Sequence, residues 1–425
     1  MKMFGWKIST IGIVAFAVLV FFIANSLNDA NIKVQPVTCD KFPSICNEPT
    51  TGTPKLLEES ISFGRFRNPT HEIKFSSDVY RENQFFKLKR WHYMAVNFEN
   101  YFFAAAIVQL NYIADVFVYV VDKRKRNEKV EYHTQRPLGF GVKFAPGSMN
   151  GCSFVTKSWF STEIGLKICY KQEGYWEIET DVLGYSDFDG SAKSIVSNIR
   201  VKRATNDALA FTFPLGASPL RPAYVHKGAG MKAKGYLSIG EGGDIQQEIK
   251  GSSGIDWTHA LALHHTQWKW VSFNSMETTT RIFKNGSIED RKTYTGINLS
   301  DKVYDFYTKT GNRQSIENAI WIDSRVVAFR YPVEISMPEN GEISGPWLIK
   351  SIKPNTEESI DLQFIPISAR EDHVDLSYIG LVSDFVQPYG YFNGTVTVTD
   401  EGEGTTYIVF FKDVFGVVEN HNALW

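Results

Sequence analysis

Short runs of β-branched and aromatic residues, repeated from about Arg90 to the C-terminus, restrict the fold of this chain more than any other feature. In one run Trp176, Ile178, Thr180 and Val182 alternate with acidic residues, the period-two pattern of a half-exposed strand. Further runs, separated by Gly, Asn and Asp, cover residues 102–112, 116–121, 359–367, 395–399 and 405–411. Aromatic residues, which favour strands, make up 14% of the sequence. The pattern predicts a mainly β protein built from barrels or sandwiches.

The length and the proline punctuation indicate two comparable halves. At 425 residues the chain is long enough for two domains, or for two half-domains that share a core. The segment between Pro214 and Pro222 divides the body. We therefore expect one β half-domain over residues 60–215 and a second over residues 216–425. Residues 29–59 are polar and rich in Pro and Thr without a periodic pattern, which is typical of an extended stalk.

The N-terminus carries a membrane signal. Residues 8–28 contain no charge, and about 20 residues at ~1.5 Å each span a ~30 Å hydrocarbon core. Lys2 and Lys7 precede this segment and Asp29 follows it, so residues 1–7 should stay in the cytosol. This predicts a transmembrane signal-anchor in a single-pass type II membrane protein, with its body in the secretory lumen or outside the cell. The alternative is a cleaved signal peptide, since residues 24–26 are small enough for a cleavage site, and the body would then be secreted.

The cysteines fit an oxidising compartment, because all four follow the uncharged segment. Four cysteines allow three pairings. Cys39 with Cys46 would close a short loop, and Cys152 with Cys169 would join two neighbouring strands. Free buried thiols are the alternative. Neither spacing is that of a zinc site, so no metal is expected.

Three sequons agree with a translocated body. They are Asn285-Gly-Ser, Asn298-Leu-Ser and Asn393-Gly-Thr, and each predicts a glycosylation site. The Asn285-Gly286 pair is also a tight-turn dipeptide, which places the first sequon on a surface hairpin.

Charge and motifs exclude several partners. The chain has 45 Lys and Arg against 47 Asp and Glu, a balance that gives no reason to expect nucleic acid. The glycine-rich residues 240–243 lack the spacing of a dinucleotide or phosphate loop, so no cofactor is expected.

Potential chemistry is concentrated in residues 254–275. Buried imidazole and indole groups need hydrogen-bond partners, so their clustering indicates a pocket wall or an extensively bonded core. The segment combines carboxylate, imidazole and indole groups: Asp256, Trp257, His259, His264, His265, Trp268 and Trp270. If His264 and His265 lie on a strand they point to opposite faces, so at most one of them faces a cavity.

Several segments, in this order, resemble the DUF2804 family, a family of unknown function. They are residues 61–65, 86–95, 111–122, 266–272, 296–299, 317–321, 390–395 and 416–425. The similarity covers about residue 55 to the C-terminus and leaves out the anchor and stalk. One departure is Leu424, which stands where the family commonly has arginine before the final tryptophan. Any salt bridge made by that guanidinium would be missing here.

The resemblance carries no activity, but its two-half pattern is similar to tandem lipocalin-like proteins, which include carotenoid hydratases. It implies two lipocalin-like halves packed together, with an apolar ligand in a barrel cavity. We expect a lipid or another apolar small molecule to bind there, against Trp257, Trp268 and Trp270.

The alternative function is that of a hydratase or isomerase, in which a buried acid protonates an apolar unsaturated substrate and the indoles stabilise the cation. Its candidate catalytic residues are Asp256, His264, His265, Glu419 and His421. These groups could instead satisfy one another in the core. A surface interaction protein without a ligand is the third interpretation.

Overall fold

The structure is a computed structural model of the chain. It describes residues 34–56, 61–75, 79, 84–125, 127–203, 207–240, 249–377 and 380–425. The predicted cytosolic tail (1–7) and transmembrane segment (8–28) lie outside the described residues. Among the helices that the structure does describe, none has the length and apolarity needed to cross a membrane. The short helical turns are η1 (Pro43–Cys46), α3 (Gln84–Lys87) and η2 (Leu215–Ala217). Most of the other described residues lie in strands, which confirms the prediction of a mainly β protein.

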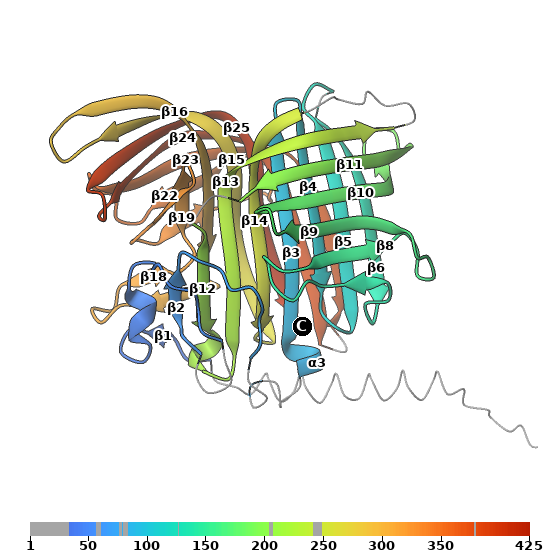
Figure 1. Cartoon of the computed structure of the whole chain (residues 1–425), viewed down its shortest axis with the longest axis horizontal. Helices are drawn as coiled ribbons and strands as arrows, with labels where there is room; N and C mark the ends of the chain where they lie inside the picture. Colours follow the sequence, from blue (N-terminus) through green and yellow to red (C-terminus); the bar gives the residue numbers. More distant parts are fainter. Residues whose placement is uncertain are drawn as a thin grey trace, which may run out of the picture.

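The first large sheet closes on itself. Within the described residues it has 13 strands, and its central members run in the order β13-β14-β3-β4-β5-β6-β10, with β11 pairing with both β10 and β13 (Figure 1). This pairing closes a ring whose strands are β3 (Leu88–Phe98), β4 (Tyr101–Gln109), β5 (Ile113–Asp122), β6 (Glu128–Pro137), β10 (Tyr175–Ser186), β11 (Ala192–Lys202), β13 (Pro222–Ile239) and β14 (Ile249–Leu261). Shorter strands extend the sheet beyond the ring: β2 (Gly64–Phe66), β7 (Val142–Lys143), β8 (Cys152–Thr156), β9 (Ile164–Lys171) and β12 (Leu209–Pro214).

The alternation of side chains along β3 separates two apolar layers. Met94 and Val96 point into the ring, where they join a core that includes the fully buried Trp176. Tyr93 and Ala95 point outward, into a second apolar cluster that contains residues from the other half of the protein. The outer face of the ring is therefore a packing surface.

The second large sheet provides the facing layer. Its 9 strands, among the described residues, run in the order β20-β19-β16-β15-β25-β24-β23-β22-β21. They are β15 (His265–Ile282), β16 (Ile288–Asp301), β19 (Ala319–Ile322), β20 (Arg325–Ala328), β21 (Val333–Ser336), β22 (Trp347–Ser351), β23 (Glu358–Leu376), β24 (Leu381–Asp400) and β25 (Thr405–Leu424). A small third sheet joins β1 (Val37–Thr38) to β17 (Asp305–Tyr307) and β18 (Arg313–Ser315).

The two large sheets approach each other closely. Gly230 of β13 faces Gly296 of β16, where an added Cβ on Gly296 would lie 2.3 Å from the backbone nitrogen of Gly230. Only a residue without a side chain allows this approach. Beside it, the Asn274 side-chain oxygen accepts a hydrogen bond from the Gly230 amide at 2.8 Å.

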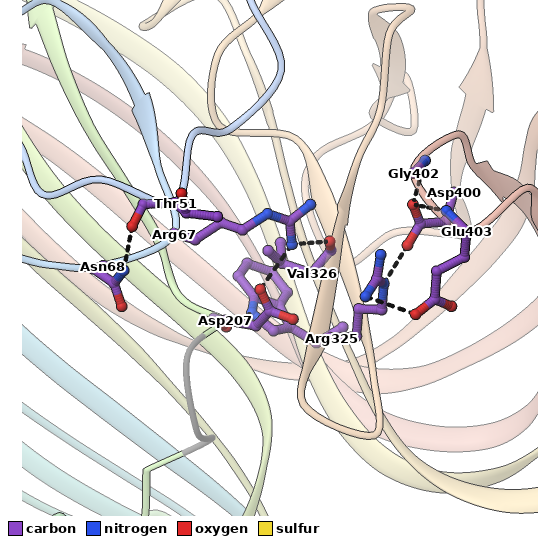
Figure 2. A network of polar contacts seen from close by, with 10 residues as sticks. Thr51, Arg67, Asn68, Asp207, Arg325, Val326, Asp400, Gly402 and Glu403 are labelled. Atoms are coloured by element: carbon purple, nitrogen blue, oxygen red, sulfur yellow. Dashed lines mark hydrogen bonds and ion pairs between the residues drawn. The ribbon is translucent and has the colours of Figure 1, made fainter.

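A polar network joins the halves at one edge (Figure 2). Arg67 pairs with Asp207 at 2.7 Å and donates to the carbonyl of Val326, in the strand β20, at 3.2 Å. The neighbouring Arg325 pairs with Asp400 and with Glu403 across the same second sheet (Figure 2). These contacts fix the N-terminal segment and the first sheet against the second.

Two predicted boundaries are wrong. The division between the large sheets falls between β14 and β15, near residues 262–264, because β13 and β14 are needed to close the ring. Pro214 and Pro222 pair with each other in the β12–β13 hairpin and do not mark a domain junction. The described part of the predicted stalk is also folded onto the body, since Val37 pairs with β17 and Ile45 is fully buried.

The disulfide pairings agree with the expectation. Cys39 is bonded to Cys46 and Cys152 to Cys169, and the described residues contain no free cysteine. The second bond links directly paired positions of β8 and β9.

Candidate functional site

A cavity of about 200 Å³ lies between the outer face of the ring and the second sheet. The wall from the ring includes alternate residues of β3 and β4: Lys89, Trp91, Tyr93, Ala106 and Val108. The opposite wall includes alternate residues of β15 and β25: Thr266, Trp268, Trp270, Glu419 and His421. The resemblance implied a ligand inside a barrel. This cavity lies outside the ring, whose interior contains large buried side chains such as Phe103 and Trp257.

A buried ion network lies in the cavity wall. The Lys227 ammonium is 2.7 Å from Asp256 Oδ2 and 3.2 Å from Glu317 Oε2, and all three side chains are buried. Burial lowers the pKa of Lys227, but the two carboxylates raise it by more, so the ammonium stays charged. Asp256 also accepts a hydrogen bond from Thr258 at 3.4 Å. Asp256 therefore acts as a hydrogen-bond acceptor that balances the charge of Lys227.

A hydrogen bond from the Trp270 indole orients this network. Trp270 Nε1 donates to Asn298 Oδ1 at 2.8 Å, and Asn298 Nδ2 donates to the carbonyl of Glu317 at 2.9 Å. The Lys227 ammonium also lies 5.3 Å from the centroid of the Trp270 ring. Trp270 thus has a polar anchor on one side and a cavity face on the other.

Glu419 is the strongest acid candidate in the cavity. Its Oε1 accepts from Trp268 Nε1 at 2.6 Å, and its Oε2 accepts from Gln387 Nε2 at 3.0 Å. The Tyr119 hydroxyl donates to Gln387 Oε1 at 2.8 Å, which turns the amide nitrogen towards Glu419. Burial raises the pKa of Glu419 to about 7, against the lowering effect of these two donors. The carboxyl group can therefore gain and lose a proton near neutral pH.

His421 is a neutral imidazole beside this acid. Burial lowers its pKa to about 3. Its Nε2 lies 3.0 Å from the Ser383 hydroxyl, while its buried Nδ1 has no hydrogen-bond partner among the described residues. The ring packs edge-on against Trp268, with centroids 4.3 Å apart, and Trp268 stacks in turn on Trp91 at 6.3 Å. Nδ1 is thus available to a polar group of a ligand or to water.

A second charged cluster borders the cavity near Asp115. Ligand atoms of Asp115, His133 and Asp372 lie within 4.8 Å of one another, the one group with metal-site spacing among the described residues. Arg370 already provides a cation there, 3.8 Å from Asp115 and 2.9 Å from Glu131. The cluster is therefore explained as an ion-pair network around a buried guanidinium, and the carboxylates are not left for a metal.

The other predicted site residues lie away from the cavity wall. Trp257 is fully buried inside the ring, where it stacks on His259 at 6.2 Å. His264 Nδ1 is 2.7 Å from the carbonyl of Trp425, and the exposed His265 bonds to Asn422 at 2.8 Å. Of the predicted set, the cavity wall brings together Asp256, Trp268, Trp270, Glu419 and His421.

The predicted glycosylation sites differ in exposure. Asn285 is exposed on the hairpin between β15 and β16, and Asn393 is half-buried on β24. Asn298 is only 3% exposed, and its side chain is bonded on both sides within the ion network. The structure contradicts a glycan at Asn298, because its Nδ2 is a buried donor in the folded chain.

Sequence reasoning missed three residues that define the site. Lys89, Lys227 and Gln387 each look like an ordinary polar position within a strand. The alternation of side chains along a strand could have identified Lys89, because this residue lies two positions before Trp91 and four before Tyr93 on the same face of β3. Nothing local distinguishes Lys227, whose partners come from β14 and from residue 317.

Comparison with known proteins identifies the family of this chain but assigns no activity to it. The family model described as domain of unknown function (DUF2804) matches residues 51–425. No curated protein matches the sequence.

Two solved structures are similar at low levels. An AttH protein from Nitrosomonas europaea has 11% identity and a TM-score of 0.39, with coverage of 82% of this chain and 96% of that one. Kievitone hydratase from Nectria haematococca has 13% identity and a TM-score of 0.35, with coverage of 83% and 93%. Likeness at this level carries no argument about chemistry.

Proposed function

The chain belongs to the DUF2804 family, and from the geometry of its site we propose that it binds a small apolar molecule in the cavity between its two large sheets. The observation that supports this proposal is a mostly apolar wall that holds a few buried polar groups, among them Glu419 and the unpartnered Nδ1 of His421. Ligand sites usually combine such walls with a small number of orienting groups.

The size of the cavity limits the ligand. A cavity of ~150 Å³ with apolar walls holds benzene, so a volume of about 200 Å³ suits one ring with a short substituent or a short unsaturated chain. A ligand of this size would contact Trp91 and Val108 on the ring wall and Trp268 on the opposite wall. The lipocalin-like interpretation of the halves is part of this proposal, with the ligand moved from a barrel interior to the interface.

Binding can be measured by the quenching of tryptophan fluorescence, using benzyl alcohol as the probe, because several tryptophans line the wall. Ala106 lies in the wall and is buried, so Ala106→Leu should fill part of the space and weaken binding. The matched control is Ala192→Leu, at an exposed position of β11, which should bind like the parent chain. Equal binding by the parent and by Ala106→Leu would refute the cavity as the site.

The protonation state of Glu419 favours a second candidate, acid-catalysed hydration or isomerisation of an apolar alkene. The carboxyl group would add its proton to one carbon of the double bond, water would attack the resulting cation, and the water proton would return to Glu419. Trp268 would stabilise the cation by its ring face, and His421 Nδ1 would hold the water. A panel of small aromatic and monoterpene alkenes in deuterated water tests this by product NMR. Turnover that persists in Glu419→Gln, or no turnover of any alkene, would refute it.

We also propose that the body is attached to a membrane through residues 8–28 and faces the lumen or the exterior, with secretion after cleavage as the alternative. The two disulfides support an oxidising compartment. The test is protease protection of the chain in microsomes, together with a gel shift on glycosidase treatment that is reduced in Asn285→Gln. Digestion of the body from the cytosolic side would contradict this topology.

A further inference from the structure

Lys89 is a buried cavity group that the proposed function does not use. It lies at the start of β3, is fully buried, and forms part of the cavity wall. Its Nζ donates one hydrogen bond, to the Tyr112 hydroxyl at 2.9 Å. It lies 4.3 Å from the centroid of the Tyr112 ring and 5.2 Å from that of Trp425. Among the described residues no carboxylate pairs with this nitrogen.

Lys227, in the same cavity wall, provides the contrast. It is equally buried but has two carboxylate partners at 2.7 and 3.2 Å, which keep it protonated. Burial lowers the pKa of Lys89 well below its ordinary value, and no charge opposes that effect. Burial without a carboxylate partner therefore favours the neutral amine of Lys89, the form of lysine that attacks carbonyl groups.

We propose that Lys89 binds the carbonyl group of a small apolar aldehyde as a Schiff base within the cavity. This inference rests on the proposed function, because the cavity must first admit an apolar molecule. In the reaction, the Nζ electron pair forms a bond to the carbonyl carbon. The carbon–oxygen bond then breaks as the carbon–nitrogen double bond forms, and both amine protons leave with the oxygen as water. No other reactant is needed.

Tyr112 assists at the reacting atoms. Burial raises the pKa of its hydroxyl, so the group keeps its proton. It already lies 2.9 Å from Nζ, next to where the carbonyl oxygen would be, and can donate a hydrogen bond to that oxygen as charge develops. The aromatic walls then hold the hydrocarbon part of the aldehyde.

The experiment uses the full chain with benzaldehyde and cyanoborohydride at neutral pH, where exposed lysines are largely protonated. Intact mass should show one benzyl group per chain, and peptide mapping of the parent protein should place it on Lys89, which requires no variant. Lys89→Met should lose this adduct. The control is Lys123→Met, because burial lowers the pKa of Lys123 to about 8 but its nitrogen bonds to Asn97, outside the cavity. This variant should be labelled like the parent.

Benzyl alcohol distinguishes failure of the Schiff-base proposal from failure of the binding proposal, because it has the same ring as benzaldehyde but no carbonyl group. Binding of benzyl alcohol without an adduct on Lys89 would overturn the Schiff-base proposal and leave the binding function intact. The absence of both benzyl alcohol binding and the Lys89 adduct in the parent chain would overturn the binding function. An adduct on Lys123 or on exposed lysines alone would also overturn the assignment to Lys89. Benzyl alcohol binding by Lys89→Met would show that this variant is folded.

Discussion

Replacing Glu419 by glutamine should change how the stability of the protein depends on pH. Burial raises the pKa of this carboxyl group from the ordinary 4.5 to about 7 in the folded chain. At ~1.4 kcal/mol per pH unit, that difference corresponds to about 3 kcal/mol of unfolding free energy. Because the folded pKa is raised, the contribution is fully present below pH 4.5 and is lost as the pH rises through about 7. The parent chain should therefore lose about 3 kcal/mol relative to Glu419→Gln between these limits.

The comparison must be made against the variant because other groups titrate in the opposite direction. Burial lowers the pKa of four histidines to about 3, so the stability they contribute is present above pH 6.5 and lost as the pH falls: His92, His226, His259 and His421. These contributions are common to both chains and cancel in the difference.

The substitution itself should be mild. The oxygen of the introduced amide can still accept from Trp268, and the Gln387 amide can turn so that its own oxygen accepts from the introduced nitrogen. The assay is urea unfolding at pH 5 and pH 8, with the exposed Glu371→Gln as control. Parallel pH profiles for the parent and Glu419→Gln, within about 1 kcal/mol, would refute the raised pKa and the acid role with it.

Three further substitutions test how the walls of the site are held. Lys227→Met should lower the unfolding free energy by ~3–5 kcal/mol, because the buried carboxylates of Asp256 and Glu317 lose their cation. Changing both carboxylates to amides should restore most of this loss. An unchanged unfolding free energy in urea would contradict the network. Gly296→Ala should lower it by ~1–3 kcal/mol, since the new Cβ would lie 2.3 Å from the Gly230 nitrogen; an unchanged urea midpoint would refute this close approach. Replacing Cys152 and Cys169 together by alanine should remove about 3 kcal/mol for a sequence separation of 17 residues, and the same midpoint with and without reductant in the parent chain would count against that value.

The fold was predictable to the extent that it depends on local alternation. Strands such as β10 follow directly from the period-two pattern around Trp176, and the short spacing within each cysteine pair agrees with the observed bonds. The division of the chain was not predictable in this way. Closing the ring needs β13 and β14, whose pairing with β11 and β3 is long-range and leaves no local mark in the sequence. Pro214 and Pro222 were misinterpreted because a hairpin and a domain junction use the same residues.

The site was partly predictable for the same reason. Neighbouring side chains on a strand point to opposite faces, as expected from the sequence for His264 and His265. The same rule applies to Asp256 and Trp257, which are neighbours on β14. Asp256 faces the cavity and Trp257 faces the ring core, so they could not share a site. The pairing of β15 with β25, which places His421 opposite Trp268, comes from opposite ends of the second half and requires the tertiary structure.

The arrangement of charge in the cavity explains why its polar groups can have different roles. Two carboxylates keep Lys227 charged, whereas burial lowers the pKa of Lys89, which has no carboxylate partner among the described residues. Burial raises the pKa of Glu419 to about 7, and its uncharged hydrogen-bond donors offset only part of this effect. Lys227 lies on β13, Lys89 on β3 and Glu419 on β25, and all three line one cavity. The residues that pack around each group therefore decide its charge state. An apolar ligand therefore meets a fixed ion pair, a nucleophilic amine and a titrating acid within a single enclosure. Binding requires only the apolar wall, whereas the amine and the acid add chemistry only for ligands that carry a carbonyl group or a double bond.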